Sequence, residues 1–284
     1  MKLPAFAYVV LLSVCFAGSA FANSTHCTVI SSAPTTLSKA GLYCLTDDLS
    51  HSTGGAAIEI DADNVTVDLN GHTIRATRSP GEAEVSYAGV TVSGHKYFSI
   101  IDGVISGFTF GVFVSDTFKG HAEGGLVADL KVIKASDGIA VSYAGCIVRN
   151  NIVTETTTVS GQNGATIYGV VVDGTGNQVT GNRIYATANG SANTHPGAAL
   201  ELEGTFSTAS GNYVANEVPS PNTIVYGIHV TGSNMLLTDN QVENFTYCYW
   251  LEGASLKYRN NLSNGCGESF GGAGVNQVDL GGNN

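Results

Sequence analysis

The stretch Tyr226–Phe245, YGIHVTGSNMLLTDNQVENF, shows the pattern on which the whole chain is built. Apolar residues alternate with other residues over Ile228-His229-Val230, a turn follows, and a second alternating run ends at Val242. Alternation of this kind predicts β-strands with one buried face, and the Gly, Ser and Asn residues between the two runs are typical of tight turns. The stretch therefore predicts two short strands joined by a turn.

The same phrase recurs along the chain, and a glycine leads into seven of its eight copies. Successive copies are 32, 22, 27, 31, 30, 28 and 21 residues apart. A regular phase with an irregular length indicates one coil per repeat, with loops inserted at a tolerated place. The first strands of the copies contain Ile58-Glu59-Ile60, Val90-Thr91-Val92, Val112-Phe113-Val114, Ile139-Ala140-Val141, Val170-Val171-Val172, Leu200-Glu201-Leu202, Ile228-His229-Val230 and Tyr249-Trp250-Leu251.

A polar residue also recurs near the end of the second run in most copies. One coil cannot bury its own inner face, but coils stacked at the strand spacing of about 4.8 Å can, and the polar column then becomes a ladder of hydrogen bonds inside the turn. A compact β-sandwich is the alternative fold, but sandwiches lack a turn amide repeated in register. The ladder is expected at Asp102, Asn150, Asn182, Asn212, Asn240 and Asn260.

These phrases, with NVTVDLNGHTI at Asn64–Ile74, resemble the right-handed parallel β-helix of the pectate-lyase-like superfamily, in particular its periplasmic and secreted branch. The resemblance covers Ala57–Leu262 and implies an all-β, single-stranded right-handed parallel β-helix of about eight coils. It is specific for architecture only, because this fold hosts lyases, hydrolases, epimerases, esterases and adhesive scaffolds. The Asp-Pro-His motif of the alginate epimerases and the catalytic set of the polygalacturonases are absent, so no specific enzyme family is matched.

The N-terminus predicts export. Lys2, the apolar run Ala5–Ala17 and Ala20-Phe21-Ala22 have the order of a secretory signal peptide, expected over residues 1–22, and the rest has no apolar run long enough to span a bilayer. We expect a secreted or periplasmic protein with an N-terminal cap over 23–54, the parallel β-helix over 55–262 and a C-terminal cap or flexible tail over 263–284. The formal net charge of −11 disfavours nucleic acid as a partner, and we expect a monomer.

Cysteine placement fits an oxidising compartment. Cys27 with Cys44, and Cys248 with Cys266, are the expected disulfides, one near each end of the β-helix. Cys146 is left over. It lies in the apolar run Cys146-Ile147-Val148, so we expect a buried thiol rather than a reactive one.

Two sets of residues are expected to point outward from the first strands, because the residues on either side of them point inward. Charge gathers in the last four coils, at Asp173, Glu201, Glu203, His229 and Glu252, and neither set contains Arg or Lys. The first outward column is Glu59, Thr91, Phe113, Ala140, Val171, Glu201, His229 and Trp250, and the second outward column is Asp61, Ser93, Ser115, Ser142, Asp173, Glu203, Thr231 and Glu252.

Adjacent coils would place Asp173 beside Glu203 and Glu201 beside His229. Two close carboxyl groups resist simultaneous ionisation, so one of them would remain an acid at neutral pH, as glycoside hydrolysis requires. The sequence therefore predicts Asp173, Glu201, Glu203 and His229 as catalytic residues. Trp250, Glu252 and Tyr226 are predicted to contact substrate, because an aromatic face can stack on a sugar ring.

Other interpretations of the same residues stay open. Polar side chains are the default on a solvated sheet face, which fits a non-catalytic structural or adhesion scaffold equally well. Asp173 and Glu203 would also suit calcium, which takes clustered carboxylates. A periplasmic metal-handling protein is supported only by the scattered His26, His51, His95 and His121. The preferred hypothesis is an exported protein that binds, and in one version cleaves, an extended polysaccharide along its first-strand face.

Overall fold

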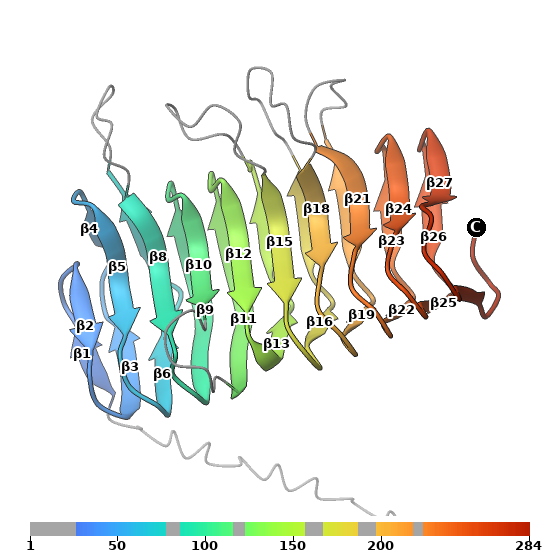
Figure 1. Ribbon diagram of the computed structural model, residues 1–284. Coiled ribbons are helices and arrows are strands. Elements are labelled where there is room, and N and C mark those ends of the chain that lie inside the picture. Colours follow the sequence, from blue (N-terminus) through green and yellow to red (C-terminus); the bar gives the residue numbers. More distant parts are fainter. Residues whose placement is uncertain (1–26, 78–85, 116–122, 157–166, 187–196, 218–223) are drawn as a thin grey trace, which may run out of the picture.

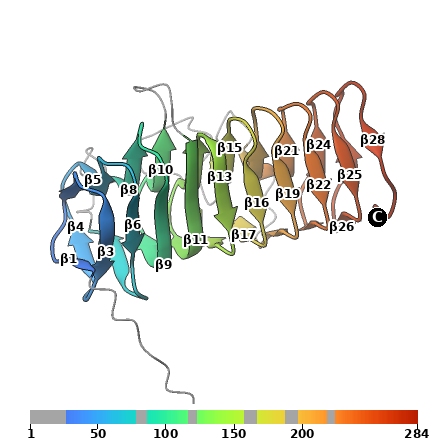
Figure 2. The same cartoon turned by 90° about the horizontal axis from the view of Figure 1, so that it is seen from below.

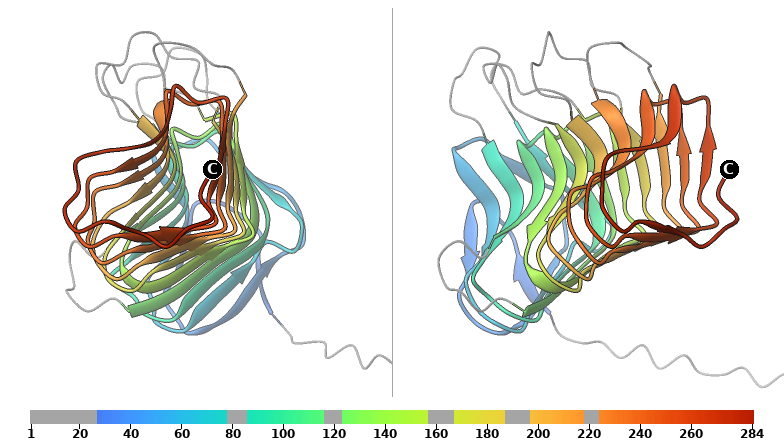
Figure 3. Two further views of the ribbon diagram at one scale, coloured as in Figure 1. Left: turned by 90° about the vertical axis from the view of Figure 1, so that its right-hand side faces the viewer. Right: turned by 45° about the vertical axis from the view of Figure 1, so that its right-hand side comes forward.

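The computed structural model describes residues 27–77, 86–115, 123–156, 167–186, 197–217 and 224–284, and this part of the chain contains strands and turns but no helix. The strands form two long sheets in which every neighbouring pair is parallel, as in β10 with β12 and β13 with β16 (Figure 1). Successive coils lie over one another when the molecule is seen near its long axis (Figure 3). The expectation of an all-β parallel β-helix is therefore confirmed.

One sheet has ten strands and contains all eight predicted first strands. Strands β2 and β27 extend it at its two ends, so residues of both segments expected to form caps continue the stack. The sheet consists of β2 (Thr35–Leu37), β5 (Gly55–Ile60), β8 (Ser86–Ser93), β10 (Phe110–Ser115), β12 (Asp137–Ser142), β15 (Tyr168–Asp173), β18 (Gly197–Leu202), β21 (Ile224–Val230), β24 (Tyr247–Leu251) and β27 (Glu268–Gly271).

The second sheet has eighteen strands and forms the rest of each coil (Figure 2). Strands β9 and β11 each run through a corner that, in the later coils, separates two shorter strands. The sheet consists of β1 (Thr28–Ile30), β3 (Gly41–Leu45), β4 (Leu49–His51), β6 (Val65–Asp68), β7 (Thr73–Ala76), β9 (Phe98–Ser106), β11 (Glu123–Ile133), β13 (Ala144–Arg149), β14 (Ile152–Thr154), β16 (Gln178–Thr180), β17 (Arg183–Ala186), β19 (Thr208–Ser210), β20 (Tyr213–Asn216), β22 (Leu236–Thr238), β23 (Gln241–Glu243), β25 (Lys257–Arg259), β26 (Leu262–Asn264) and β28 (Val278–Asp279).

The core fills the inside of the coils. The apolar residues predicted to face inward are buried throughout, as at Ile58, Val170 and Ile228, and they belong to one continuous cluster. Tyr249 is also buried there and stacks on Phe270 of the last coil, with ring centroids 4.6 Å apart. Because each coil covers the apolar side chains of the next, burial accumulates along the stack rather than around one centre.

An asparagine ladder runs through the corner of the second sheet, as expected, but two of its members differ from those predicted. Asn182, Asn212 and Asn240 are buried and linked in series by their side-chain amides. The ladder continues through Asn151 and Asn261, not Asn150 and Asn260.

The correction has a local cause in the residue that precedes each ladder asparagine. Asn150 and Asn260 have φ of 56° and 52°, and Gly181 has φ of 64° in the same place. This left-handed residue turns the chain, and its side chain faces solvent, so the next residue points inward. Asp102, with φ of 55°, is another exposed residue of this kind and does not belong to the ladder.

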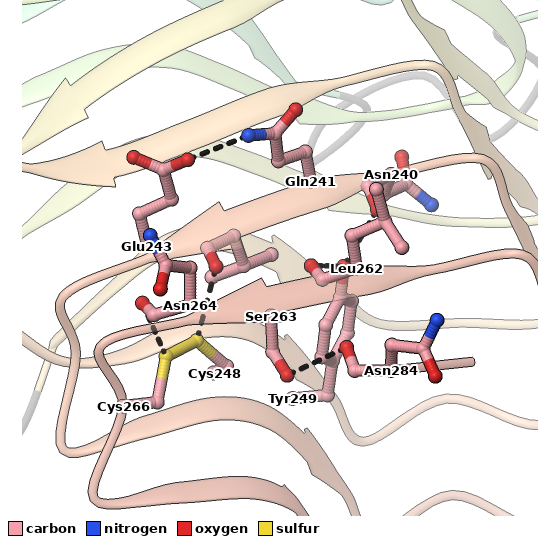
Figure 4. Close-up of a disulfide and its surroundings, with 11 residues drawn as sticks. Asn240, Gln241, Glu243, Cys248, Tyr249, Leu262, Ser263, Asn264, Cys266 and Asn284 are labelled. Carbon is pink, nitrogen blue, oxygen red and sulfur yellow. Dashed lines mark hydrogen bonds between the residues drawn. A yellow bond between two sulfur atoms is a disulfide. The ribbon is translucent and has the colours of Figure 1, made fainter.

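Both predicted disulfides form, Cys27–Cys44 and Cys248–Cys266, with Cα–Cα distances of 5.7 and 5.8 Å. The second ties strand β24 to the turn that follows β26 (Figure 4). Cys146 is free and buried, as expected, and burial raises the pKa of its thiol to about 12. A thiol with so high a pKa is a poor nucleophile at neutral pH.

Candidate functional site

The outward face of the ten-stranded sheet brings the predicted charged residues together. Strands β15, β18, β21 and β24 are consecutive neighbours (Figure 1). Their register pairs Val171 with Glu201, Glu201 with His229, and His229 with Trp250. These residues of the first outward column are therefore direct neighbours across the strands, as expected. Residues that are 21 to 30 apart in the chain thereby become neighbours across single strand spacings.

His229 lies between two carboxylates. Its Nδ1 is 2.8 Å from Oε2 of Glu201, and its Nε2 is 3.1 Å from Oε2 of Glu252. Burial alone would lower the pKa of His229, but its hydrogen bonds and charge interactions with both glutamates outweigh burial and raise that pKa above its ordinary value. Both carboxylates thus favour the charged form of the imidazole.

The two glutamates differ in their access to solvent. Glu201 is only 3% exposed, so its carboxylate is covered and acts chiefly on His229. Glu252 is more open, and hydrogen bonds from His229 and Trp250 lower its pKa. Glu201 is therefore a residue that positions His229, while Glu252 remains available to a ligand on the sheet face.

Glu203 is the acid whose environment favours protonation. It follows β18 directly, and Asp173 occupies the matching place at the end of β15. Burial, and then the negative charges of Glu201 and Asp173, raise the pKa of Glu203 above its ordinary value, which His229 only partly offsets. The predicted pairing of Asp173 with Glu203 thus has an electrostatic consequence, because one carboxyl group retains its proton to higher pH.

Three aromatic rings lie beside this charged cluster. Tyr226 stacks on His229, with ring centroids 4.6 Å apart and an interplanar angle of 25°. Tyr247 and Trp250 follow on the next strand at 4.5 Å, and Tyr226 is 5.8 Å from Trp250. We call Tyr226, Tyr247 and Trp250 the aromatic cluster. It forms one edge of the charged site.

Tyr226 and Tyr247 belong to a third outward column, which alternation alone does not predict. Tyr226 lies two residues before the inward Ile228, so alternation would turn it inward as well. Gly227 between them also faces inward, since a Cβ there would collide with Val242, and this break in alternation turns Tyr226 outward. The third outward column is paired in register across six strands, as Phe110, Asp137, Tyr168, Ala198, Tyr226 and Tyr247.

Asp137 is the titratable residue of this column that the sequence analysis missed. It is half-buried, and its Oδ1 accepts a hydrogen bond from the backbone N–H of Tyr168 at 3.0 Å. Burial raises the pKa of Asp137 from 3.8 to about 7 despite that hydrogen bond. Its position directly before Gly138, matching Tyr226 before Gly227, was the available signal.

We expect Asp137→Asn to make the protein more stable above about pH 7. The folded-state pKa of Asp137 is raised from 3.8 to about 7, so the folded protein favours the protonated form and loses stability as pH rises through that window. An amide can keep the bond from Tyr168 without titrating. Urea unfolding across this range should show a wild-type decline of about 2–4 kcal/mol that the variant lacks. Parallel curves for the two proteins would contradict the assignment.

The described residues give less support to metal binding than to a site for sugars. No group of three or more His, Cys, Asp and Glu side chains there is arranged to hold a metal ion, and calcium at Asp173 and Glu203 stays a prediction. His51 is buried and stacks on Phe108, whereas His95 contacts both Asp61 and Asp63. His26 and His121 lie outside the described residues, as does the predicted signal peptide.

No model of a known protein family matches the chain, and no curated protein sequence matches it. Among solved structures it is similar to XylC in complex with xylose, with a TM-score of 0.53 and 13% identity, covering 78% of this chain and 38% of XylC. It is also similar to a DFA-IIIase from Arthrobacter chlorophenolicus A6 in complex with DFA-III, with a TM-score of 0.49 and 14% identity, covering 78% of this chain and 53% of the DFA-IIIase.

A third similar structure is that of the periplasmic alginate epimerase AlgG, with a TM-score of 0.45 and 14% identity, covering 86% of this chain and 76% of AlgG. The chain thus spans well under half the length of XylC and about half that of the DFA-IIIase. No apolar helix of bilayer-spanning length occurs in the described part of the chain. Together with its parallel sheets, the likeness to XylC shows that this protein has the right-handed parallel β-helix fold.

Proposed function

We propose that this protein is exported and hydrolyses an extended, neutral polysaccharide that it binds along the outward face of the ten-stranded sheet. The observation that carries the proposal is the meeting, on one face, of an acid whose pKa is raised, a histidine held between two carboxylates, and the aromatic cluster. The two disulfides support an oxidising, periplasmic or extracellular location.

Glu203 is the general acid in this proposal. It protonates the glycosidic oxygen of the leaving sugar, for which a carboxyl group with a raised pKa is suited. Asp173 is the second carboxylate: either it attacks the anomeric carbon as the bond to the leaving oxygen breaks and water later displaces it, or it takes a proton from a water that attacks that carbon directly. His229, held by Glu201 and Glu252, donates a hydrogen bond to a substrate oxygen when either contact opens.

The charge of the site favours neutral sugars. Asp173, Glu201 and Glu252 outnumber the single positive charge of His229 even when Glu203 is protonated. Such a surface repels a polymer that carries a carboxylate on every ring, while it stabilises the positive charge that develops on the sugar in the transition state. The structure therefore supports neutral glycans over polyuronates as substrates.

The proposal is tested by incubating the purified protein with soluble neutral and acidic polysaccharides and measuring reducing ends. We expect release from at least one neutral glycan and none from polyuronates. Release from polyuronates alone would overturn the substrate class. No release from any glycan, with migration still retarded in gels that contain a neutral glycan, would replace hydrolysis by binding alone. If reducing ends are not released and migration is not retarded, the remaining interpretation is a structural scaffold.

Trp250→Ala is expected to weaken glycan binding about tenfold, because the indole face and its contact with Tyr247 are lost. Affinity electrophoresis in gels that contain the bound glycan measures this change. A suitable control is Tyr97→Asn, which removes an exposed aromatic ring from a turn where φ is 56° and asparagine fits. Equal weakening by both variants would argue against a stacking role for Trp250.

A further inference from the structure

A second pair of aromatic side chains lies on the same face, toward the N-terminal end of the stack. Phe110 and Phe113 of β10 have ring centroids 4.7 Å apart, and both are half-buried. They are three residues apart, as are Tyr226 with His229 and Tyr247 with Trp250, so they occupy the same third and first outward columns. The pair is not part of the charged site described above.

Next to this pair, the outward face of the sheet has one polar side chain, Asp137, and otherwise small apolar side chains. Phe110 is the register partner of Asp137, and Phe113 is the register partner of Ala140. Val171 continues the first outward column on the following strand. Small apolar side chains between the phenylalanines and Glu201 leave the sheet without a charged residue in this part of the column.

Along the long axis of the stack, the order of strands places the proposed acids between the two aromatic groups. The sequence of neighbours is β10, β12, β15, β18, β21 and β24, with Asp173 at the end of β15 and Glu203 directly after β18. Four strand spacings separate β10 from β21, or about 19 Å at roughly 4.8 Å each. An oligosaccharide of several rings is needed to contact both aromatic groups.

We infer that Phe110, Phe113 and Asp137 form a neutral-sugar subsite on the far side of the acids from the aromatic cluster, so that the protein cleaves internal linkages of its glycan. This inference rests on the proposed function. A chain bound to both aromatic groups has rings on each side of Asp173 and Glu203, and the bond that these acids attack is then an internal one.

The chemistry of the subsite fits an uncharged sugar. The faces of the two phenyl rings suit the apolar face of a pyranose, as aromatic side chains do at wet binding sites. Burial raises the pKa of Asp137 to about 7, so a large fraction of these side chains carries a hydroxyl below that pH and can donate a hydrogen bond to a sugar oxygen. An acidic sugar would gain no charge partner there, in agreement with the preference for neutral glycans.

The test compares how wild-type protein and Phe113→Ala cut a polymer and a series of oligosaccharides of increasing length. For the wild type we expect the viscosity of the polymer to fall before many reducing ends appear, and kcat/KM to rise with oligosaccharide length. For Phe113→Ala we expect a loss of about two- to tenfold in kcat/KM on the longer substrates and none on the shortest cleaved one. Phe113→Trp should restore the length dependence, and Tyr97→Asn serves as the control.

The outcomes separate this inference from the proposed function. Release of only the smallest products from the start, with little fall in viscosity, would show cleavage from a chain end and overturn the inference while hydrolysis stands. An equal loss on short and long substrates would place Phe113 outside a distal subsite and likewise overturn it. If no glycan is hydrolysed, the proposed function is wrong, and the inference that rests on it is wrong as well. Thermal unfolding of Phe113→Ala checks that the half-exposed site tolerates the change.

Discussion

Glu203→Gln is expected to lower kcat by about 100- to 10,000-fold on the glycan that the wild-type protein cleaves. The change removes one proton donor but keeps the size of a side chain whose pKa is raised by burial and by Glu201 and Asp173. Glycan binding should therefore change little, since the aromatic cluster is intact. Initial rates, together with retardation in affinity gels, measure the two effects separately.

The pH dependence gives the same prediction a second readout. An acid catalyst works in its protonated form, so wild-type activity should fall as pH rises through the elevated pKa of Glu203. The residual activity of Glu203→Gln should lack that alkaline limb. The matched control is Glu59→Gln in the first outward column of β5, where the carboxylate accepts a hydrogen bond from the hydroxyl of Thr36. If Glu203→Gln cleaves at the wild-type rate, Glu203 is not the general acid, and Asp137 is the next residue to test.

Asn212→Ala is expected to lower the free energy of unfolding by about 3–5 kcal/mol, because it interrupts the ladder in its middle. The Oδ1 of Asn212 accepts from both the backbone N–H and the Nδ2 of Asn182 at 3.0 Å. Its Nδ2 donates to the carbonyl of Val179 and to Oδ1 of Asn240, both at 2.9 Å. Removing the amide leaves buried polar groups of these neighbours without partners, which costs more than a lost exposed bond.

Urea unfolding followed by circular dichroism measures this loss, and Asn150→Gly is the control. Asn150 is the exposed residue directly before a ladder position, and its φ of 56° suits glycine. It should cost no more than about 1 kcal/mol, since the only bond lost is an exposed one to Asp129 at 3.3 Å. A similar cost for both variants would mean that the ladder does not stabilise the stack beyond an ordinary turn.

The ladder also shows how far a repeated pattern can be followed without coordinates. Asn182, Asn212 and Asn240 were predicted correctly because each follows a residue other than asparagine. At Asn150-Asn151 and Asn260-Asn261 the pattern offers two amides, and only the left-handed φ of the first shows which one points inward. The backbone conformation of a turn thus decides between residues that composition cannot distinguish.

The site was predicted in part for the same reason. Strand register follows from the phase of the repeat, so Glu201 and His229 could be expected to be neighbours, as they are. The third outward column was missed, since it depends on the inward placement of glycines such as Gly227. Asp137, although it stands before such a glycine, was therefore overlooked.

The amino-acid sequence by itself determined the architecture of this protein, which inward residues fill its core, and which cysteines pair. These features follow from a period of two within strands and a phase that repeats from coil to coil. Only the tertiary structure decided the state of the site: the two contacts of His229, the covering of Glu201 and the raised pKa values of Glu203 and Asp137. The pKa of a side chain depends on its burial and on the charges around it, and these come from every coil that packs against it. A local pattern of residues does not contain this information.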